Sequence, residues 1–558
     1  MARPRRPALR AALIPLCALA ACVDSAEPPD WPPEATVGAE VSCASPTAGF
    51  DRLRSEGPER GFGLSLAPMP DQGCVPLSGG VVAEDLDGDG DVDALLQNVA
   101  GFPHLFENDG SGHFEQHDTP FDALAAHGRR IYGQAAVDLD GDRLPEIVLY
   151  GPSLVLVAQN LGGLTFGPPE PIYDLPDPPW ACIHGVAFGD VDGDGDLDLF
   201  LPQADVLETR QSNWLFNPPG GGPDLVLVHD GADWRQAAAL NPAAGSNVSL
   251  LATFTDRDGD GDFDVLSPAD RAFEYPGRVA FYRNDGGPAL VDDAPDVGAA
   301  VDVSGMGIAT TDFNHDGLLD YCLTDQYPQV RCLTSIAETG RWVESGTAMG
   351  LVADPGAHPG FEGEQWEAWS IELVDLDNDG WQDAAATAGC PAPPPPPEQS
   401  VRPDALWQGR DGGQTVAFDD RSASTGFNLG EGHYGMAAAD FSGDGSVDLL
   451  IGARSGQPVF WDNPCGPGAW LEVELVGLPA NPRAFGARVT VDWAGGRSEV
   501  QEIQGPRGLG QSPARLHFGL GDVDEVESVS IRWPSGADTV VERVPTRRVL
   551  TVEHPPEG

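Results

Sequence analysis

The sequence has 558 residues, of which 41% are hydrophobic, so it can bury a large core, and its 70 Gly and 52 Pro favour turns and short strands over long helices. Its 87 acidic residues outnumber 31 basic ones, and the net charge of −56 argues against nucleic acids and anionic membrane surfaces as partners. Either the acids are dispersed over the surface or bound cations neutralise many of them.

The N-terminus has the pattern of an export signal. Several Arg residues precede an apolar run over residues 11–21, which is too short to cross a bilayer as a helix. The run ends in LAAC at residues 19–22, which resembles a bacterial lipobox. This predicts a signal peptide over 1–21, lipidation of Cys22 and a Pro-rich tether over 22–42; an ordinary signal peptide with a chance cysteine is the alternative. The predicted location is the bacterial cell envelope, as an outer-membrane lipoprotein held at the membrane by its lipid alone.

An Asp-rich pattern, D-x-D/N-x-D-G-x-x-D, recurs seven times over residues 85–448, at spacings of about 52 to 66 residues. Each copy lies between two short apolar runs, and a hairpin signal and a further strand follow. A unit of four antiparallel strands cannot bury both of its faces alone, whereas radial stacking of such sheets buries them. The sequence therefore predicts an all-β fold with a seven-bladed β-propeller over 43–464.

The acidic positions of the seven copies are candidate calcium ligands. Ca²⁺ takes roughly six to eight oxygens, and acids at positions 1, 3, 5 and 9 can turn inward around one ion when Gly at position 6 permits the bend. Solvated acidic turns without metal are the alternative, but they do not explain why carboxylates converge seven times without basic partners. Up to seven Ca²⁺ ions are predicted, with these ligands: Asp85, Asp87, Asp89 and Asp93; Asp138, Asp140, Asp142 and Glu146; Asp190, Asp192, Asp194 and Asp198; Asp256, Asp258, Asp260 and Asp264; Asp312, Asn314, Asp316 and Asp320; Asp375, Asp377, Asp379 and Asp383; Asp440, Ser442, Asp444 and Asp448.

Two copies depart from the pattern. The second has Arg143 in place of Gly and Pro145 near its end, and the seventh has the neutral Ser442 at position 3. These two copies are predicted to bind Ca²⁺ most weakly.

The predicted ring must close on itself. The seventh repeat reaches only residues 459–462 before a new domain begins, whereas the segment GFDRL at 49–53 resembles the fourth strand AFDDR at 417–421. A strand around Phe50 is therefore predicted to complete the seventh blade; a loose cap over 35–80 is the alternative. The proline-rich run at 391–397 is interpreted as a stiff surface loop.

The sequence contains nine cysteines, and export permits disulfides. Connectivity cannot be read from sequence, but three pairs are candidates: Cys43–Cys74, Cys322–Cys332 and Cys390–Cys465.

Residues 465–554 alternate apolar and polar positions between turn signals, as in Leu471, Val473 and Leu475. This predicts a small C-terminal all-β domain of about six strands that packs on the propeller.

The repeats and the C-terminal segment resemble known families. The seven loops resemble FG-GAP or VCBS repeats, the calcium-bearing propeller repeats also found in integrin α chains. The C-terminal segment resembles an ASPIC/UnbV domain, on the motifs WLEVELVG (470–477), GARVTV (486–491), LHFGLG (516–521) and IRWPSG (531–536). The combination is similar to bacterial relatives of the cartilage acidic protein family, which implies a secreted or surface propeller with calcium in its loops. As a departure, the hairpin turn signals are degraded in blades three, five and six.

The sequence lacks the GxSxG, HExxH, P-loop and dinucleotide-binding motifs. Several His and aromatic residues precede the inner strands, where they could line a ligand-binding rim of the central funnel: His127, His184, Trp369, His433 and Tyr434. Packing at the blade entrance is the alternative for these residues.

The predicted function is a non-catalytic binding or adhesion scaffold for an unknown protein or glycan at the cell surface or in the periplasm. One alternative is an extracellular enzyme whose residues converge at the funnel rim. Another is a structural or calcium-buffering protein of the envelope.

Overall fold

The computed structural model describes residues 31–47, 49–63, 79–97, 102–121, 124, 131–175, 180–204, 206–207, 223–231, 233–240, 248–270, 278–337, 339–353, 366–389, 402–413, 415–430, 432–453 and 457–556. The predicted signal peptide, Cys22 and the proline-rich run lie outside these residues. Within the described residues, no helix is both long and apolar enough to cross a membrane.

Among the described residues, seven sheets, called blades 1 to 7, each contain four antiparallel strands and hold one Asp loop between the first and second of these strands. Blades 1 to 3 contain β3 (Val81–Glu84), β4 (Asp93–Gln97), β5 (Pro103–Asn108) and β6 (Phe114–His117); β7 (Gly133–Val137), β8 (Glu146–Gly151), β9 (Leu154–Ala158) and β10 (Glu170–Asp174); β12 (Ala187–Gly189), β13 (Asp198–Leu201), β15 (Asp224–His229) and β16 (Trp234–Leu240). Blades 4 and 5 contain β17 (Thr253–Thr255), β18 (Asp264–Pro268), β19 (Val279–Arg283) and β20 (Val291–Asp292); β21 (Ile308–Thr311), β22 (Asp320–Leu323), β23 (Arg331–Ile336) and β24 (Arg341–Glu344). Blades 6 and 7 contain β25 (Ala368–Val374), β26 (Asp383–Ala388), β27 (Ala405–Asp411) and β28 (Val416–Asp420); β29 (His433–Ala439), β30 (Asp448–Ala453), β31 (Val459–Asp462) and β2 (Arg54–Ser55).

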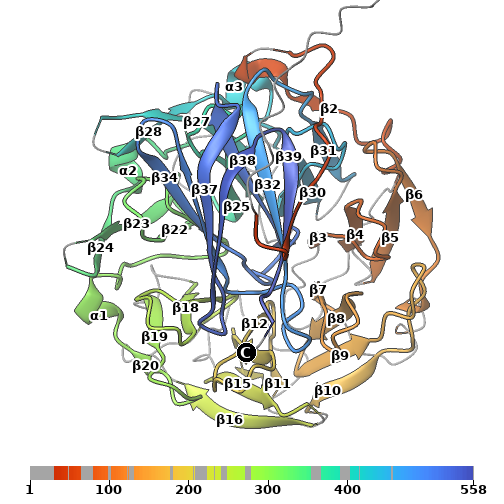
Figure 1. Cartoon of the computed structure of the whole chain (residues 1–558). Helices are drawn as coiled ribbons and strands as arrows, with labels where there is room; N and C mark the ends of the chain where they lie inside the picture. The colour runs from red at the N-terminus through yellow and green to blue at the C-terminus, as the bar shows by residue number, and fades with distance from the viewer. Residues whose placement is uncertain are drawn as a thin grey trace, which may run out of the picture.

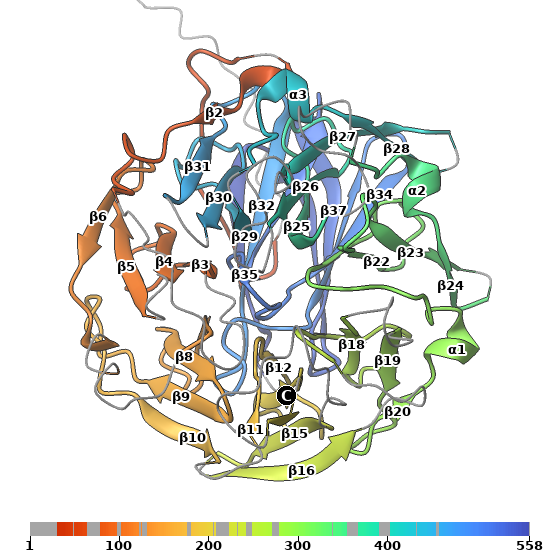
Figure 2. The same cartoon turned by 180° about the vertical axis from the view of Figure 1, so that it is seen from behind.

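The blades form a ring around a central axis (Figures 1 and 2), which confirms the predicted β-propeller. Three short helices follow the fourth strands of blades 4, 5 and 6: α1 (Ala294–Val297), α2 (Gly346–Met349) and α3 (Ser422–Thr425). A further two-stranded sheet pairs β11 (Trp180–Ala181) with β14 (Val206–Leu207).

The innermost strands carry small residues because the blades converge toward the axis. Gly189 in β12 lies so close to the next blade that a Cβ atom there would be 2.5 Å from the ring of Phe254. A Cβ atom on Gly435 in β29 would lie 2.2 Å from the carbonyl oxygen of Leu509. Gly therefore allows close approach of the next blade at residue 189 and of the C-terminal domain at residue 435.

The ring closes as predicted, through a strand from the N-terminal segment. In β2, Arg54 pairs with Asp462 and Ser55 with Trp461 of β31, so this strand is the outermost in blade 7. Phe50 itself does not lie in this strand. It begins a short 3₁₀ turn, η1 (Phe50–Arg52), after Gly49 with φ 99°, and its ring is buried against blade 7.

The disulfides differ in part from the prediction. Cys322 and Cys332 are bonded and face each other across β22 and β23, as predicted. Cys465, however, is bonded to Cys43, so the candidate pairs Cys43–Cys74 and Cys390–Cys465 are wrong. Ring closure brings the N-terminal segment to the end of blade 7, and a pairing across 422 residues of sequence follows from that topology rather than from local spacing.

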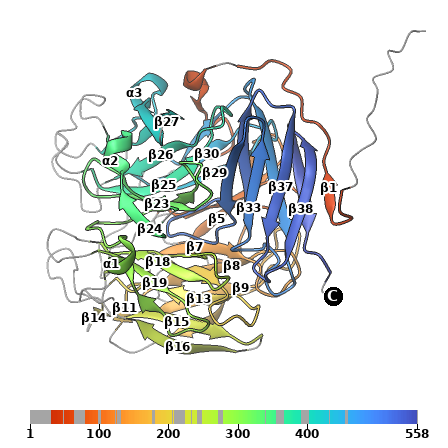
Figure 3. The ribbon, with the colours of Figure 1, turned by 60° about the vertical axis from the view of Figure 1, so that its left-hand side comes forward.

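The C-terminal domain is a sandwich of two sheets and contains more strands than the six predicted. One sheet orders β1 (Ala35–Val37), β39 (Arg548–Glu553), β32 (Ala469–Val476) and β36 (Arg515–Gly521); the other orders β34 (Arg497–Glu502), β33 (Arg488–Trp493), β37 (Glu525–Arg532) and β38 (Asp538–Pro545). The predicted alternation buries Leu471, Val489 and Ile531 in its core. Figure 3 shows this domain as a separate layer on one face of the propeller, which confirms the predicted packing.

Candidate metal centre

The Asp loops are built around their first acid. In the first loop, the Asp85 carboxylate accepts hydrogen bonds from the backbone N–H groups of Gly88 at 2.7 Å and Gly90 at 3.1 Å. The same pattern recurs at Asp190, which accepts from Gly193 and Gly195. These bonds curl the chain back on its first acid, and in five loops the acid at position 3 lies close to it.

Position 6 adopts a left-handed conformation, as the pattern predicted. Gly90, Gly195 and Gly380 have φ values of 98°, 96° and 89°. Residues other than Gly rarely adopt this backbone conformation without strain. In the second loop Arg143 occupies this position with φ 75°, so the bend is preserved in spite of the substitution.

The acid at position 9 joins the loop to the third strand of its blade. Asp93 is buried and accepts hydrogen bonds from the backbone N–H of Leu86 in the loop and of Asn108 at the end of β5. Asp383 and Asp448 hold the corresponding positions in blades 6 and 7. Burial raises the pKa of the Asp93 carboxyl to about 8. A bound cation would act against this shift, because a nearby positive charge favours the ionised form.

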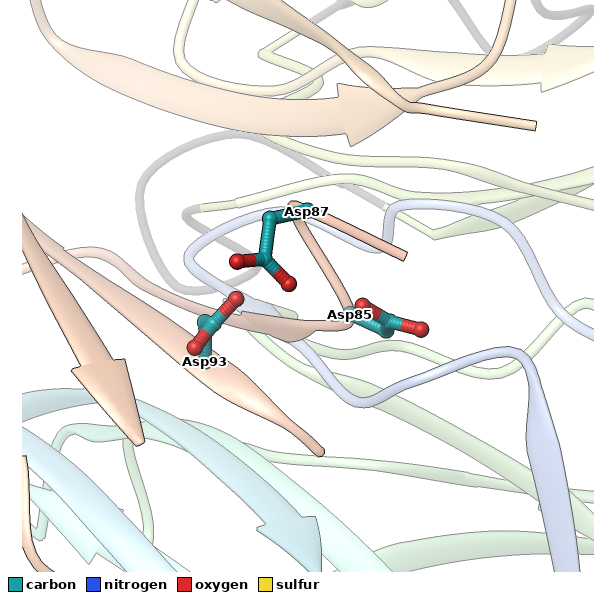
Figure 4. A group of neighbouring side chains, drawn as sticks. All are labelled: Asp85, Asp87 and Asp93. Carbon is teal, nitrogen blue, oxygen red and sulfur yellow. The ribbon is translucent and has the colours of Figure 1, made fainter. Parts of the chain in front are cut away.

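Five loops each bring three carboxylate groups together, with one ligand oxygen from each lying within 4.8 Å of the others. The triads are Asp85, Asp87 and Asp93; Asp138, Asp140 and Glu146; Asp190, Asp192 and Asp194; Asp256, Asp258 and Asp260; and Asp375, Asp377 and Asp383. Figure 4 shows the first of them, with its carboxylates gathered at one side of the loop. Three converging carboxylates suit a hard cation that prefers oxygen ligands, so these residues fit Ca²⁺.

The other two loops form no such triad among the described residues. Asn314 in the fifth loop and Ser442 in the seventh replace the acid at position 3, so each has only three of the four predicted acids. In the second loop, by contrast, Glu146 joins the triad in place of Asp, although Arg143 occupies the position of Gly.

Two arginines, Arg257 and Arg52, lie close to acids of the loops, contrary to the expectation that these acids lack basic partners. Arg257, at position 2 of the fourth loop, is buried and lies 3.2 Å from the Asp264 carboxylate and 2.6 Å from that of Asp293. Asp264 is not part of the triad of its loop. Arg52, from η1, is buried between the sixth and seventh loops and donates to the carbonyl of Leu376.

The residues proposed for a ligand rim are buried, so the prediction of an open rim is wrong for those that the structure describes. His184 stacks on Tyr132 with ring centroids 5.3 Å apart, and burial lowers its pKa to about 3. The rings of Trp369 and Tyr434 pack at a tilt with their centroids 4.4 Å apart, and His433 contacts a buried carboxylate. These large side chains fill the wedge between neighbouring blades. His127 lies outside the described residues.

The C-terminal domain contacts the Asp loops, which the sequence patterns did not predict. Arg483 lies 3.2 Å from Glu84 and donates to the carbonyl of Asp85 in the first loop. In the fifth loop, His315 contacts the carbonyl of Ser498. A usable signal was present, because basic residues outnumber the acids Asp492, Glu499 and Glu502 over residues 483–515 of an otherwise acidic chain: Arg483, Arg488, Arg497, Arg507 and Arg515.

A loop of the C-terminal domain enters the propeller channel from the side of the Asp loops. Its strand β35 (Gly510–Gln511) pairs in parallel with β3 of blade 1. The Gln511 side chain bonds the backbone N–H and carbonyl of Ala136 in blade 2, and Arg507 lies 3.2 Å from Glu372 in blade 6. The channel is therefore filled by the chain's own residues at this end.

A cleft of about 630 Å³ remains between the propeller and the C-terminal domain. One wall is formed by the third and fourth loops, with Asp190, Asp194 and Asp262. The other wall is formed by residues 477–481, Pro534 and His554 of the C-terminal domain. The third and fourth loops thus border open space beside the docked domain.

Comparisons with known proteins agree with this architecture. Residues 477–558 match the family described as ASPIC and UnbV, and residues 85–149 and 138–201 match the FG-GAP-like repeat. Mouse (Mus musculus) cartilage acidic protein 1 is 25% identical over 503 residues, covering 84% of this chain and 72% of that protein.

Among solved structures, an Agrocybe aegerita lectin that recognises non-reducing terminal N-acetylglucosamine shares 16% identity over 68% of this chain and 87% of its own, with a TM-score of 0.41. BBS1N in complex with ARL6DN shares 11% identity over 72% of this chain and 97% of its own, with a TM-score of 0.39.

Proposed function

We propose that this chain, which carries FG-GAP-like repeats and an ASPIC/UnbV domain, is an exported, calcium-loaded scaffold that binds a protein or glycan without catalysing a reaction. The proposal includes the predicted signal peptide over residues 1–21 and a lipid on Cys22, which would hold the propeller at the outer membrane by a flexible tether. No role in binding nucleic acid is proposed, because the net charge is −56.

The observation that carries the proposal is the set of five carboxylate triads on one face of the ring. Without a cation, the acids of each triad repel one another at short range. Ca²⁺ would remove this repulsion and connect the first strand, the loop and the second strand of the blade. Extracellular calcium modules bind with dissociation constants of about 10⁻⁴ to 10⁻³ M, so ions plentiful outside the cell would stabilise the folded state by mass action.

The disulfides support an oxidising compartment. Cys43–Cys465 joins the N-terminal segment to the end of blade 7, and Cys322–Cys332 joins two strands of blade 5. Such structural disulfides are typical of exported proteins and are rare in the cytosol.

The cleft beside the third loop supports a binding role. It combines carboxylates and backbone groups of the Asp190 loop with apolar and polar residues of the C-terminal domain. Ligand-binding clefts commonly have volumes of about 300–1,000 Å³, and they are favoured where two domains meet. A scaffold held rigid by calcium would present such a cleft with little loss of conformational entropy on binding.

The proposal is tested first by counting bound ions, with native mass spectrometry of residues 23–558 in millimolar calcium and after chelation. We expect about five bound ions. Detection of no bound calcium would contradict the calcium-binding part of the proposal. The same protein then serves as bait for envelope proteins and for a glycan array, with calcium and with chelator. Specific retention of one protein or glycan in calcium supports the scaffold. Retention of nothing, or the same retention in chelator by a protein that remains folded, contradicts it.

A further inference from the structure

The sixth loop lies directly against the C-terminal domain. Asn378, at position 4 of this loop, is buried, and its side-chain oxygen lies 2.7 Å from Nε2 of His517. Its backbone carbonyl accepts the N–H of Gly521 at 2.8 Å. Its side-chain amide also donates to the carbonyl of Gly445 in the seventh loop, so one residue joins two loops and the C-terminal domain.

The ligand residues of this loop are in contact with the same domain. A Cβ atom on Gly519 of β36 would lie 1.8 Å from Oδ2 of Asp375, so the domain's backbone passes directly over the first acid of the triad. Gln382, beside Asp383, donates to the Glu499 carboxylate at 2.7 Å. The wall of this candidate metal site is thus made partly by the C-terminal domain.

These contacts require one conformation of the loop. Asn378 has φ 58° and Gly380 has φ 89°, and together they direct the Asn378 carbonyl toward β36 and the acids toward each other. A cation inside the triad holds this curl, whereas repulsion among the acids of an empty triad opposes it. The third loop contrasts with the sixth, because space is open within 4 Å around Gly193 and Gly195.

We propose that calcium in the sixth loop controls the docking of the C-terminal domain on the propeller. The proposal rests on the calcium binding proposed above and extends it to the chain's own domain interface. With the ion bound, the loop presents Asn378 to His517 and Gly521, and the 503–514 segment stays in the channel. Loss of the ion releases these contacts, while the ring closure at β2 and the Cys43–Cys465 disulfide keep the two domains together.

Linkage makes the effect reciprocal. If bound calcium raises the equilibrium constant for docking by a certain factor, docking raises the affinity of the sixth loop for calcium by the same factor. Coupling of this kind commonly amounts to about 5- to 150-fold in affinity. His517→Ala removes one docking contact without changing an acid of the triad. It should therefore weaken calcium binding at one site.

The test compares two double variants of the full chain that change the same loop positions. Asp375→Asn with Asp377→Asn empties the sixth loop, and Asp190→Asn with Asp192→Asn empties the third. Native mass spectrometry counts the ions in each variant. Hydrogen exchange measures the Gly521 amide, which bonds across the interface, and the amides of 503–514 in the channel.

In millimolar calcium, we expect the sixth-loop variant to exchange these amides at least about fivefold faster than wild type, and the third-loop variant to match wild type. His517→Ala should raise the dissociation constant of one calcium site by at least about fivefold in calorimetry. The proposal is overturned if the sixth-loop variant loses its ion while interface exchange stays unchanged, or if both double variants speed exchange equally. Absence of calcium from the wild-type protein would instead contradict the proposed function.

Discussion

Single residues decide how well each loop can form its bend. Six copies have Gly at position 6, whereas the second has Arg143, whose side chain is exposed while its backbone has φ 75°. A residue with a Cβ atom in this conformation costs about 1 kcal/mol relative to Gly. The geometry of the second triad is nevertheless intact, so the substitution affects the energy of the loop more than its shape.

Arg143→Gly should therefore stabilise the protein by about 0.5–1 kcal/mol, because relief of strain exceeds the extra freedom of Gly in the unfolded chain. The reverse change in the third loop, Gly195→Arg, should destabilise it by about 1 kcal/mol, since Gly195 has φ 96° and open space around it. Denaturant unfolding in calcium and in chelator measures both. Equal stability of Arg143→Gly and wild type in both conditions would show that the left-handed backbone carries no cost.

Asp224 at the start of β15 is a buried acid outside the Asp loops. Its carboxylate accepts hydrogen bonds from the backbone N–H of Gln203 and from the hydroxyl of Ser249. Burial raises its pKa from 3.8 to about 7. Because the folded state holds the proton more tightly, its contribution to stability is complete below pH 4 and is lost as the pH rises to about 7.

Between pH 4 and 7, Asp224 should lower the free energy of unfolding by about 1.4 kcal/mol per pH unit. Asp224→Asn carries no titrating proton, so its stability should fall less steeply across this window. Urea unfolding at several pH values in saturating calcium provides the comparison, with the exposed Asp522→Asn as control. Parallel pH profiles for wild type and Asp224→Asn would contradict the assignment.

At the scale of elements, ring closure depends on a short strand and the turn before it. β2 contains only Arg54 and Ser55, so its backbone pairing alone contributes little. Phe50 and Leu53 add buried apolar surface against blade 7. Arg52 adds a buried cation close to the acids of the sixth and seventh loops, including Asp377 and Asp444.

Arg52→Met should destabilise the protein by about 3 kcal/mol, because the side-chain oxygen of Asn463 loses its Arg52 donor, the carbonyl of Leu376 loses one of its two donors, and nearby acids lose a positive charge. Arg54→Met, in the exposed strand that follows, should change stability by less than about 0.5 kcal/mol. Thermal unfolding in calcium measures both variants. Similar melting temperatures for the two would show that the buried guanidinium does not hold the closure.

Local patterns explain which elements could be predicted from sequence. The Asp loops and their strands follow from contiguous residues, and the closing strand follows from the likeness between two short segments. The docking of Arg483 and His517 could not be predicted, because their partners are more than a hundred residues away and no pattern pairs them. The burial of Trp369 also depends on a neighbouring blade, which a single repeat does not reveal.

At the scale of the whole molecule, the N-terminal segment connects every part. It adds β1 to the C-terminal sandwich, bonds through Cys43 to Cys465 and adds β2 to blade 7. The same N-terminal segment therefore holds the propeller closed and pairs with the C-terminal domain, so the two are not independent units. The Cys43–Cys465 disulfide encloses 422 residues, whereas Cys322–Cys332 spans only 10.

This difference leads to a prediction about the two disulfides. In the chain-entropy account, a cross-link stabilises the fold by restricting the unfolded chain, and the effect grows with the logarithm of the enclosed length. The loop of 422 residues should therefore contribute about 3 kcal/mol more than the loop of 10.

Double substitution of Cys43 and Cys465 by Ser should lower the free energy of unfolding by that much more than the same change at Cys322 and Cys332. Both variants are compared by urea unfolding in calcium, with native disulfides verified by mass spectrometry. If the Cys322 and Cys332 variant is equally or more destabilised, restriction of the unfolded chain does not dominate, and the closure is held by the native contacts of β2 and Arg52 instead.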